Sequence, residues 1–133
     1  MGLDMYLDKS FYIDKNIEIY KNKKLIYSGN KVTYRIPAGQ WRKAYHIHEW
    51  LADNADVGID YNAMYFVPRE KLAELLKVCK KVKANPEKAE ELLPTYPDVD
   101  YDEEYFYDID ETIKILEEAL KDKKVDYLYS TWF

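Results

Sequence analysis

The sequence has one cysteine, Cys79, which excludes an intramolecular disulfide and a zinc site built from several cysteines. Glycine is also scarce, because four residues in 133 leave little material for the tight loops that cradle phosphates. The chain contains no Gly-x-Ser-x-Gly motif, no phosphate-loop motif and no dinucleotide-binding fingerprint. Common signatures of hydrolases and nucleotide-binding enzymes are therefore missing, and the single cysteine suits a reducing compartment.

Long hydrophobic runs are missing as well. No apolar stretch approaches the roughly 18 residues that a membrane-spanning helix needs. The first ten residues, MGLDMYLDKS, carry an early aspartate and no basic segment, unlike a secretory signal peptide. Tyr6 stands where an N-myristoylation motif has serine or threonine. We therefore expect a cytoplasmic protein without a membrane partner.

The chain does have enough apolar material for one domain, and an excess of tyrosine. Apolar residues make up 47% of the sequence and charged residues 34%. The formal net charge of −5 argues against general nucleic-acid binding. Fourteen tyrosines suit sheet faces and interfaces, since each offers an apolar ring and a hydroxyl that needs a partner.

Alternating hydrophobicity predicts short strands in the first forty residues. Leu3, Met5 and Leu7 fall on one face of an extended segment. Two β-rich runs, NIEIY and KLIYS, flank a hairpin turn around Asn22, and SGN at 28–30 indicates a second turn. KVTYRI alternates again before Pro37 and Gly39, which we expect to end the strand. These signals predict an antiparallel meander.

Helical spacing dominates the rest of the chain. It predicts helices over 40–54, 68–85, 86–93 and 108–122, the last with Asp110 as its N-cap, and leaves the segment 94–106 as a loop. Strands are expected at 63–67 and 125–133. We therefore expect one α+β domain over residues 1–133, in which three to four helices pack on one face of a mostly antiparallel sheet. The first and last strands can pair and tie down both ends.

Several sequence blocks resemble one family, a group of small uncharacterised proteins encoded by bacterial viruses and prophages. The blocks are the opening MGLDMYL, a central WRKAxxIHxW at Trp41 to Trp50, a REKL-containing helix within 65–82, YDEEYF running into TIKILEEAL, and a final SxW at Ser130 and Trp132. The chain departs from the pattern at Tyr45, where asparagine is common, so a polar site that used this asparagine would be altered. The resemblance implies a viral accessory protein that acts in a bacterial cytoplasm, by binding a host factor, countering a host defence or sequestering a signalling nucleotide.

The run QWRKAYHIHEW gives the first candidate site. Arginine supplies a planar fork for phosphate, lysine a point charge, and a helix N-terminus further donors, while an aromatic ring can stack on a base. The candidate ligand-binding residues are Trp41, Arg42, Lys43, Tyr45 and His48. On a helix, Arg42, His46 and Glu49 project to one side, whereas His48 falls on the apolar stripe, where a histidine is typically a core residue with satisfied nitrogens.

Metal binding and nucleophilic catalysis have weaker support. On a helix, the one-residue gap in His-Ile-His turns the two rings about 200° apart, which does not suit a shared zinc ion. Cys79 follows Leu72, Leu75 and Leu76 on an apolar stripe, so we expect a buried, inert thiol. We expect no metal and no cofactor.

The second candidate site is acidic. No basic residue occurs between Lys88 and Lys114, and ten acidic residues fall in that gap. An EF-hand is rejected, because Glu103 and Ile109 stand where its glycine and its final glutamate belong. The segment can be a docking face for a basic partner or a nucleic-acid mimic, or a solvated loop before a helix. The candidate partner-binding residues are Tyr101, Asp102, Glu103, Glu104, Tyr105 and Tyr107.

Three functional hypotheses remain open at this point. The first is a non-enzymatic binder that engages a host protein or a small anionic, nucleotide-like ligand. The second is a small enzyme acting on a phosphorylated or nucleotide substrate, with His46 or His48 as general acid or base and Arg42 as anion clamp. The third is an assembly protein that forms homo-oligomers through its tyrosine-rich strands.

Overall fold

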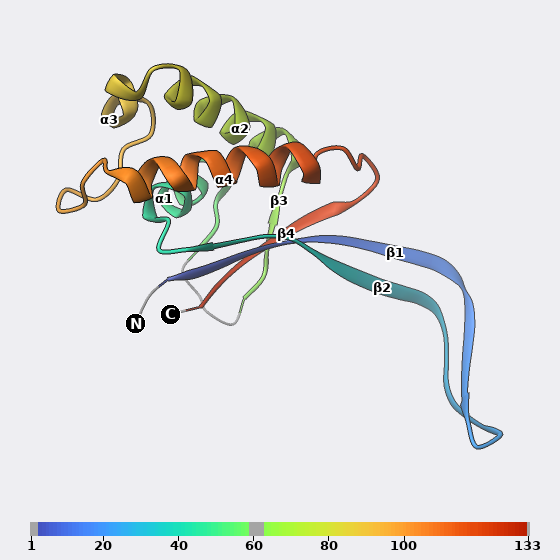
Figure 1. The fold of residues 1–133 in the computed structure, drawn as a ribbon. Coiled ribbons are helices and arrows are strands. Elements are labelled where there is room, and N and C mark those ends of the chain that lie inside the picture. The colour runs from blue at the N-terminus through green and yellow to red at the C-terminus, as the bar shows by residue number, and fades with distance from the viewer. Residues whose placement is uncertain (1–2, 59–62, 133) are drawn as a thin grey trace.

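A long N-terminal β-hairpin and a helical layer make up the fold shown in Figure 1, a computed structural model. The structure describes residues 3–58 and 63–132, with the side chains of 12–20 and 26–33 outside this description. Strand β1 (Asp4–Lys21) turns at Asn22 and Lys23 into β2 (Lys24–Arg42). Both turn residues have positive φ, 53° and 63°, as a two-residue hairpin turn requires, so the turn predicted around Asn22 is confirmed.

The sheet has the strand order β2-β1-β4-β3, and all of its pairings are antiparallel. The two further strands are β3 (Tyr65–Val67) and β4 (Asp126–Trp132). The predicted pairing of the first and last strands is confirmed, since β1 pairs with β4 from Asp4↔Trp132 to Ser10↔Asp126. The predicted last strand included Phe133, which lies outside the described residues.

All helices described lie on one face of the sheet, which confirms the predicted α+β architecture (Figure 1). Their bounds are α1 (Tyr45–Ala55), α2 (Arg69–Ala84), the 3-10 turn η1 (Pro86–Lys88), α3 (Ala89–Leu92) and α4 (Glu103–Ala119). Leu3, Met5 and Leu7 face this layer and are almost completely buried. Tyr127 and Tyr129 of β4 join them, so the core lies between the central strands and the helices.

The predicted meander is wrong, because β2 continues through both of its expected breaks. Ser28 and Gly29 stay paired with Glu18 and Ile17, so SGN makes no turn. The strand absorbs Pro37 at a register shift, where Ala38 is an extra residue opposite β1. Proline is tolerated there because β2 is an edge strand and has no partner on its other side.

Two helix starts also differ from the prediction. Residues 40–42 belong to β2 and not to α1, since Trp41 pairs with Met5 across the ladder. The last helix begins at Glu103, earlier than predicted, and its N-cap is Asp102 rather than Asp110. The Asp102 carboxylate accepts the backbone N–H groups of Glu104 and Tyr105, which satisfies donors that would otherwise be orphaned. The segment YDEEYF is therefore mostly helical.

The hairpin extends well past the rest of the sheet. Pairing of β1 with β4 stops at Ser10, which is opposite Arg35 on β2. Residues 11–34 beyond this point form a two-stranded projection, called the arm below. In Figure 1 the arm bends away from the helical layer, toward the side of the sheet that no described helix covers.

Candidate functional sites

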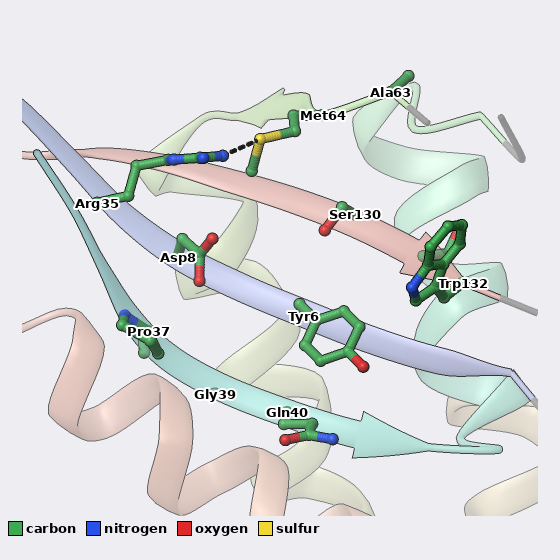
Figure 2. A pocket seen from close by; sticks show the side chains of 12 residues that line it. Tyr6, Asp8, Arg35, Pro37, Gly39, Gln40, Ala63, Met64, Ser130 and Trp132 are labelled. Carbon is green, nitrogen blue, oxygen red and sulfur yellow. Dashed lines mark hydrogen bonds between the residues drawn. The ribbon is translucent and has the colours of Figure 1, made fainter. Parts of the chain in front are cut away.

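The sheet face opposite the helices, called the open face below, carries a broad hollow of about 1120 Å³ (Figure 2). Side chains from β1, β2, β4 and the residues before β3 surround it, among them Tyr6, Asp8, Arg35, Gln40, Met64 and Trp132. The Arg35 guanidinium reaches from the edge strand β2 toward the Met64 sulfur, which lies next to β3 at the opposite edge of the sheet. Because Arg35 is the β2 residue next to the arm, one end of the hollow lies at the base of the arm.

Large apolar side chains are exposed on this open face. Trp132 is 55% exposed and Phe66 57% exposed, and alternation along β4 and β3 turns both away from the buried Tyr129 and Val67. The charges nearly cancel, since Asp4 and Asp8 stand near Arg35 and Arg42. The Asp4–Arg42 pair is 3.8 Å apart and solvent-exposed, so it adds little stability. The open face is a nearly neutral, partly aromatic surface.

A second hollow, called the His46 cleft below, lies between the β2–α1 turn and the start of α4. It measures about 380 Å³, and its lining includes Arg42, Lys43, His46, Thr95, Glu104 and Asp108. Two hydrogen bonds fix the loop that forms one wall. The Thr95 N–H donates to the Tyr101 hydroxyl at 3.2 Å, and the Tyr105 hydroxyl donates to the Leu93 carbonyl at 2.6 Å. Because both partners of each hydrogen bond belong to this chain, the wall forms without a ligand.

His46 forms part of the floor of this cleft. Its side chain is 3% exposed and stacks on Tyr105 with ring centroids 4.2 Å apart. Burial lowers the pKa of His46 to about 4, against a smaller raising effect of a backbone hydrogen bond with Tyr105, so the ring is neutral at pH 7. The expected grouping of Arg42, His46 and Glu49 on one side of a helix is wrong for Arg42, because α1 starts after that residue. His46 itself packs against Tyr105 of α4.

Asp108 gives the same cleft a perturbed carboxyl group. Burial raises the pKa of Asp108 to about 6, and the neighbouring carboxylates of Glu104, Asp102 and Glu111 raise it further in the same direction. Lys43 stands on the opposite wall, with a positive φ of 56° and an N–H bonded to the Leu3 carbonyl at 2.6 Å. The cleft thus joins parts of both candidate sites predicted from the sequence.

The five predicted ligand-binding residues are not brought together on one surface. Trp41 is buried, and its indole N–H donates to the Thr112 hydroxyl of α4 at 2.7 Å. His48 is buried too, with Nδ1 2.8 Å from the Tyr129 hydroxyl, which confirms its expected core position. Burial lowers the pKa of His48. Arg42 and Lys43 are exposed and line the His46 cleft.

Tyr45, the fifth of these residues, points elsewhere and tilts against Tyr96 with ring centroids 5.1 Å apart. Neither Trp41 nor Tyr45 therefore lines the hollow that contains Arg42 and Lys43. A base stacked on Trp41 is excluded by the burial of the indole between the sheet and α4.

The predicted partner-binding residues form the first turns of α4 and the residue before its N-cap. Tyr105 is buried, so it anchors the helix and is not available to a partner. Tyr107 is 63% exposed, and Asp102, Glu103 and Glu104 are exposed around it. Tyr101 is half-buried and meets Tyr105 edge-on. What remains on the surface is an acidic helix end with one exposed tyrosine.

Sequence reasoning missed the open face and Thr95. Strand alternation contained a usable signal, because Trp132 and Ser130 fall on the face opposite Tyr129 and Tyr127. A large aromatic residue on the face that should be polar indicates a second apolar surface. For Thr95, no signal exists in the sequence, since its burial depends on how the loop after α3 folds back onto α1.

Further chemistry on the described residues is limited. No group of three or more His, Cys, Asp or Glu side chains in residues 3–58 and 63–132 is placed to hold a metal ion. Cys79 is buried, and burial raises its pKa to about 12, so its thiol stays protonated.

In residues 3–58 and 63–132, no helix has the length and apolar character to cross a bilayer. Comparisons with protein-family models, with curated proteins and with solved structures found no match to this chain.

Proposed function

We propose that this is a non-enzymatic binding protein of viral or prophage origin that holds a host protein between the open face and the arm. The observation that carries the proposal is the exposure of Trp132 at a wide hollow, and of Phe66 on the same sheet face, which no described helix covers. Exposed apolar patches of this kind mark interaction surfaces in soluble proteins. The sequence resemblance to bacteriophage and prophage proteins supports a host protein as the partner.

The distribution of charge indicates which kind of partner fits. The arm sequence contains five lysines and two acidic residues, a net charge of +3, whereas the remaining fifteen basic and twenty-three acidic residues give −8. Three lysines gather at the tip of the arm, at Lys21, Lys23 and Lys24, and all are exposed. The partner then presents an apolar patch to the open face and an acidic patch to the arm tip.

A protein suits this surface better than a nucleic acid. The hollow contains Asp8, and Asp4 occupies the same face, so a phosphate backbone would meet carboxylates beside the aromatic rings. The hollow is also wider than a small-molecule pocket. An apolar anchor from a protein surface fills such a space without placing charges against Asp8.

The test begins with affinity capture from bacterial lysate and continues with the captured protein in purified form. We expect a 1:1 complex whose dissociation constant rises about thirtyfold with Trp132→Ser or Phe66→Ser, the loss of one aromatic anchor. The matched control is Tyr107→Ser, which removes an equally exposed aromatic residue from α4 and should leave affinity unchanged.

Three outcomes contradict the proposal. The first is equal binding by the wild type and the Trp132→Ser variant. The second is light scattering that shows a homodimer dissociated by Trp132→Ser, which would assign the open face to a second copy. The third is selective recovery of nucleic acid, with binding that weakens steeply as salt rises.

A further inference from the structure

The first turns of α4 border a hollow of about 600 Å³, called the α4 groove below. Three aromatic rings and three carboxylates line it, from Tyr101, Phe106 and Tyr107 and from Asp102, Glu103 and Asp110. A smaller hollow of about 270 Å³ continues it toward Lys83 of α2, since Phe106 and Asp110 line both. Rings flanked by carboxylates suit an ammonium group, because the face of a ring and a carboxylate both attract a cation.

The carboxylates of the groove differ in how far the chain itself uses them. Asp102 caps α4, and Asp110 pairs with Lys83 at 3.1 Å. Glu103 is exposed and makes no ion pair with any of the side chains that the structure describes. Tyr107, which lines the same hollow, is 63% exposed. The α4 groove therefore presents an unused negative charge and an aromatic ring to solvent.

The opposite charge gathers at the tip of the arm. Lys21, Lys23 and Lys24 are exposed there, and the neighbouring Leu25 is 52% exposed. Lys21 and Lys24 are directly opposite each other in the ladder, a position in which like charges repel. A negative surface docked against the tip would offset this repulsion. The arm tip therefore suits an acidic surface that also accepts an apolar side chain.

The arm tip and the α4 groove cannot meet within one chain. They lie at opposite ends of the molecule, because α4 begins at the end away from the projecting arm (Figure 1). Two copies that lie antiparallel bring the arm tip of each copy to the groove of the other. Such a pair has two identical contacts and closes on itself, as two-fold dimers do.

We propose that the protein forms a weak two-fold dimer, in which the lysines of each arm tip dock in the α4 groove of the other copy. An ammonium group of the tip pairs with Glu103 and lies against the ring of Tyr107. The open face takes no part, so the inference does not rest on the proposed function. Both use the arm tip, and a partner protein bound there would displace the second copy.

Sedimentation equilibrium of the full chain tests the dimer. We expect its dissociation constant to rise about tenfold between about 0.1 M and about 1 M salt, because the Debye length falls from about 10 Å to about 3 Å. An arm variant, Lys21→Glu with Lys24→Glu, should be monomeric where the wild type is dimeric. A groove variant, Glu103→Lys with Asp110→Asn, should be monomeric too, since either change removes the attraction at both contacts.

The mixture of these two variants gives the sharpest result. In a mixed pair, the altered arm meets the altered groove, and the unaltered arm meets the unaltered groove. We therefore expect the mixture to recover the mass of a dimer, which also shows that both variants are folded. The matched control is Lys123→Glu with Lys124→Glu, which makes the same change of charge at exposed lysines outside the arm and the groove, and should leave the dimer intact.

Two aromatic variants separate this surface from the open face. Tyr107→Ser should raise the dissociation constant of the dimer about fivefold, the loss of an exposed cation–π contact. Trp132→Ser removes an equally exposed ring from the open face and should leave the dimer unchanged.

The inference is overturned if the wild type stays monomeric up to about 1 mM, where contacts of only about 4 kcal/mol would be detected. It is also overturned if the mixed variants stay monomeric, or if the lysine control dissociates the dimer as the arm variant does. A dimer that Trp132→Ser dissociates and the arm variant does not would contradict both this inference and the proposed function. An intact dimer without a captured partner would contradict the proposed function alone.

Discussion

At the scale of single residues, His46 and Asp108 give the protein opposing responses to acid. His46 is neutral in the fold until about pH 4, whereas an exposed imidazole in the unfolded chain protonates near 6.5. Between these values the unfolded state binds the extra proton, so the free energy of unfolding rises with pH and falls on acidification. Asp108, with its pKa raised to about 6 from 3.8, binds its proton more tightly when folded, so its contribution falls as pH rises through that range.

The first prediction follows from these signs. Wild-type protein loses stability between pH 6.5 and 4, with a His46 contribution of about 3 kcal/mol that the Asp108 carboxyl partly offsets. His46→Gln should flatten this loss, and Asp108→Asn should make it steeper. Urea unfolding at intervals from pH 4.5 to 7.5 measures both changes. His48 adds a smaller effect of the same sign, so some acid sensitivity remains in His46→Gln. Equal pH profiles for the three proteins would show that neither group titrates as described.

The two histidines also show which side-chain positions the sequence can predict and which it cannot. Helical spacing placed His48 on the apolar stripe correctly, because that stripe depends only on the local period. The same spacing grouped His46 with Arg42 and Glu49 and gave no sign of its burial, since nothing local indicates that α4 packs on that face of α1. Burial of a helix or strand by a neighbour on a second side depends on tertiary packing, which the local sequence does not show. The contacts of His46, Trp41 and Tyr105 all depend on such packing.

At the scale of elements, the connection between β2 and α1 explains why the segment from Trp41 to Trp50 resembled a ligand-binding site. Trp41, Lys43 and His48 each hold one element to another: Trp41 binds α4, Lys43 bonds the segment before β1, and His48 bonds β4. Unusual residues in a short run can thus serve packing instead of chemistry. The element boundaries were hard to predict, because proline and glycine normally break strands and here sit in a bulged edge strand.

Gly39 gives the second prediction, at this scale. A Cβ on Gly39 would overlap Ile115 Cγ2, so glycine lets β2 pass close beneath α4. Gly39→Ala should lower the free energy of unfolding by about 2 kcal/mol through overpacking. In the double variant with Ile115→Ala, the new methyl group takes space that the isoleucine vacates, so the losses should not add and the coupling should be about 1 kcal/mol. Urea unfolding of the two single variants and the double variant measures this coupling. Strictly additive losses would mean that the helix shifts freely away from the strand.

At the scale of the whole molecule, the chain consists of a body with a covered core and an arm without a second layer. Core residues come from the sheet, the helices and the segments that join them, and none of the arm side chains that the structure describes belongs to the core. Isolated two-stranded hairpins are marginally stable in water. The alternation of apolar residues in the sequence predicted strands here but not their length, because Ser28 and Gly29 of the expected turn stay paired within the ladder.

The third prediction separates the arm from the body. Ser10 and Arg35 are opposite each other, so residues 11–34 can be replaced by Asn-Gly, which closes a two-residue hairpin turn at that position. The shortened protein should fold with a melting temperature within about 5 °C of the wild type, because the core stays complete. Its affinity for the captured partner should fall, because the lysines at the arm tip are lost. Circular dichroism on heating measures the melting temperature, and titration with the captured partner measures the affinity. A body that fails to fold would show that the arm nucleates or stabilises the sheet, and retained partner affinity would restrict the docking surface to the open face alone.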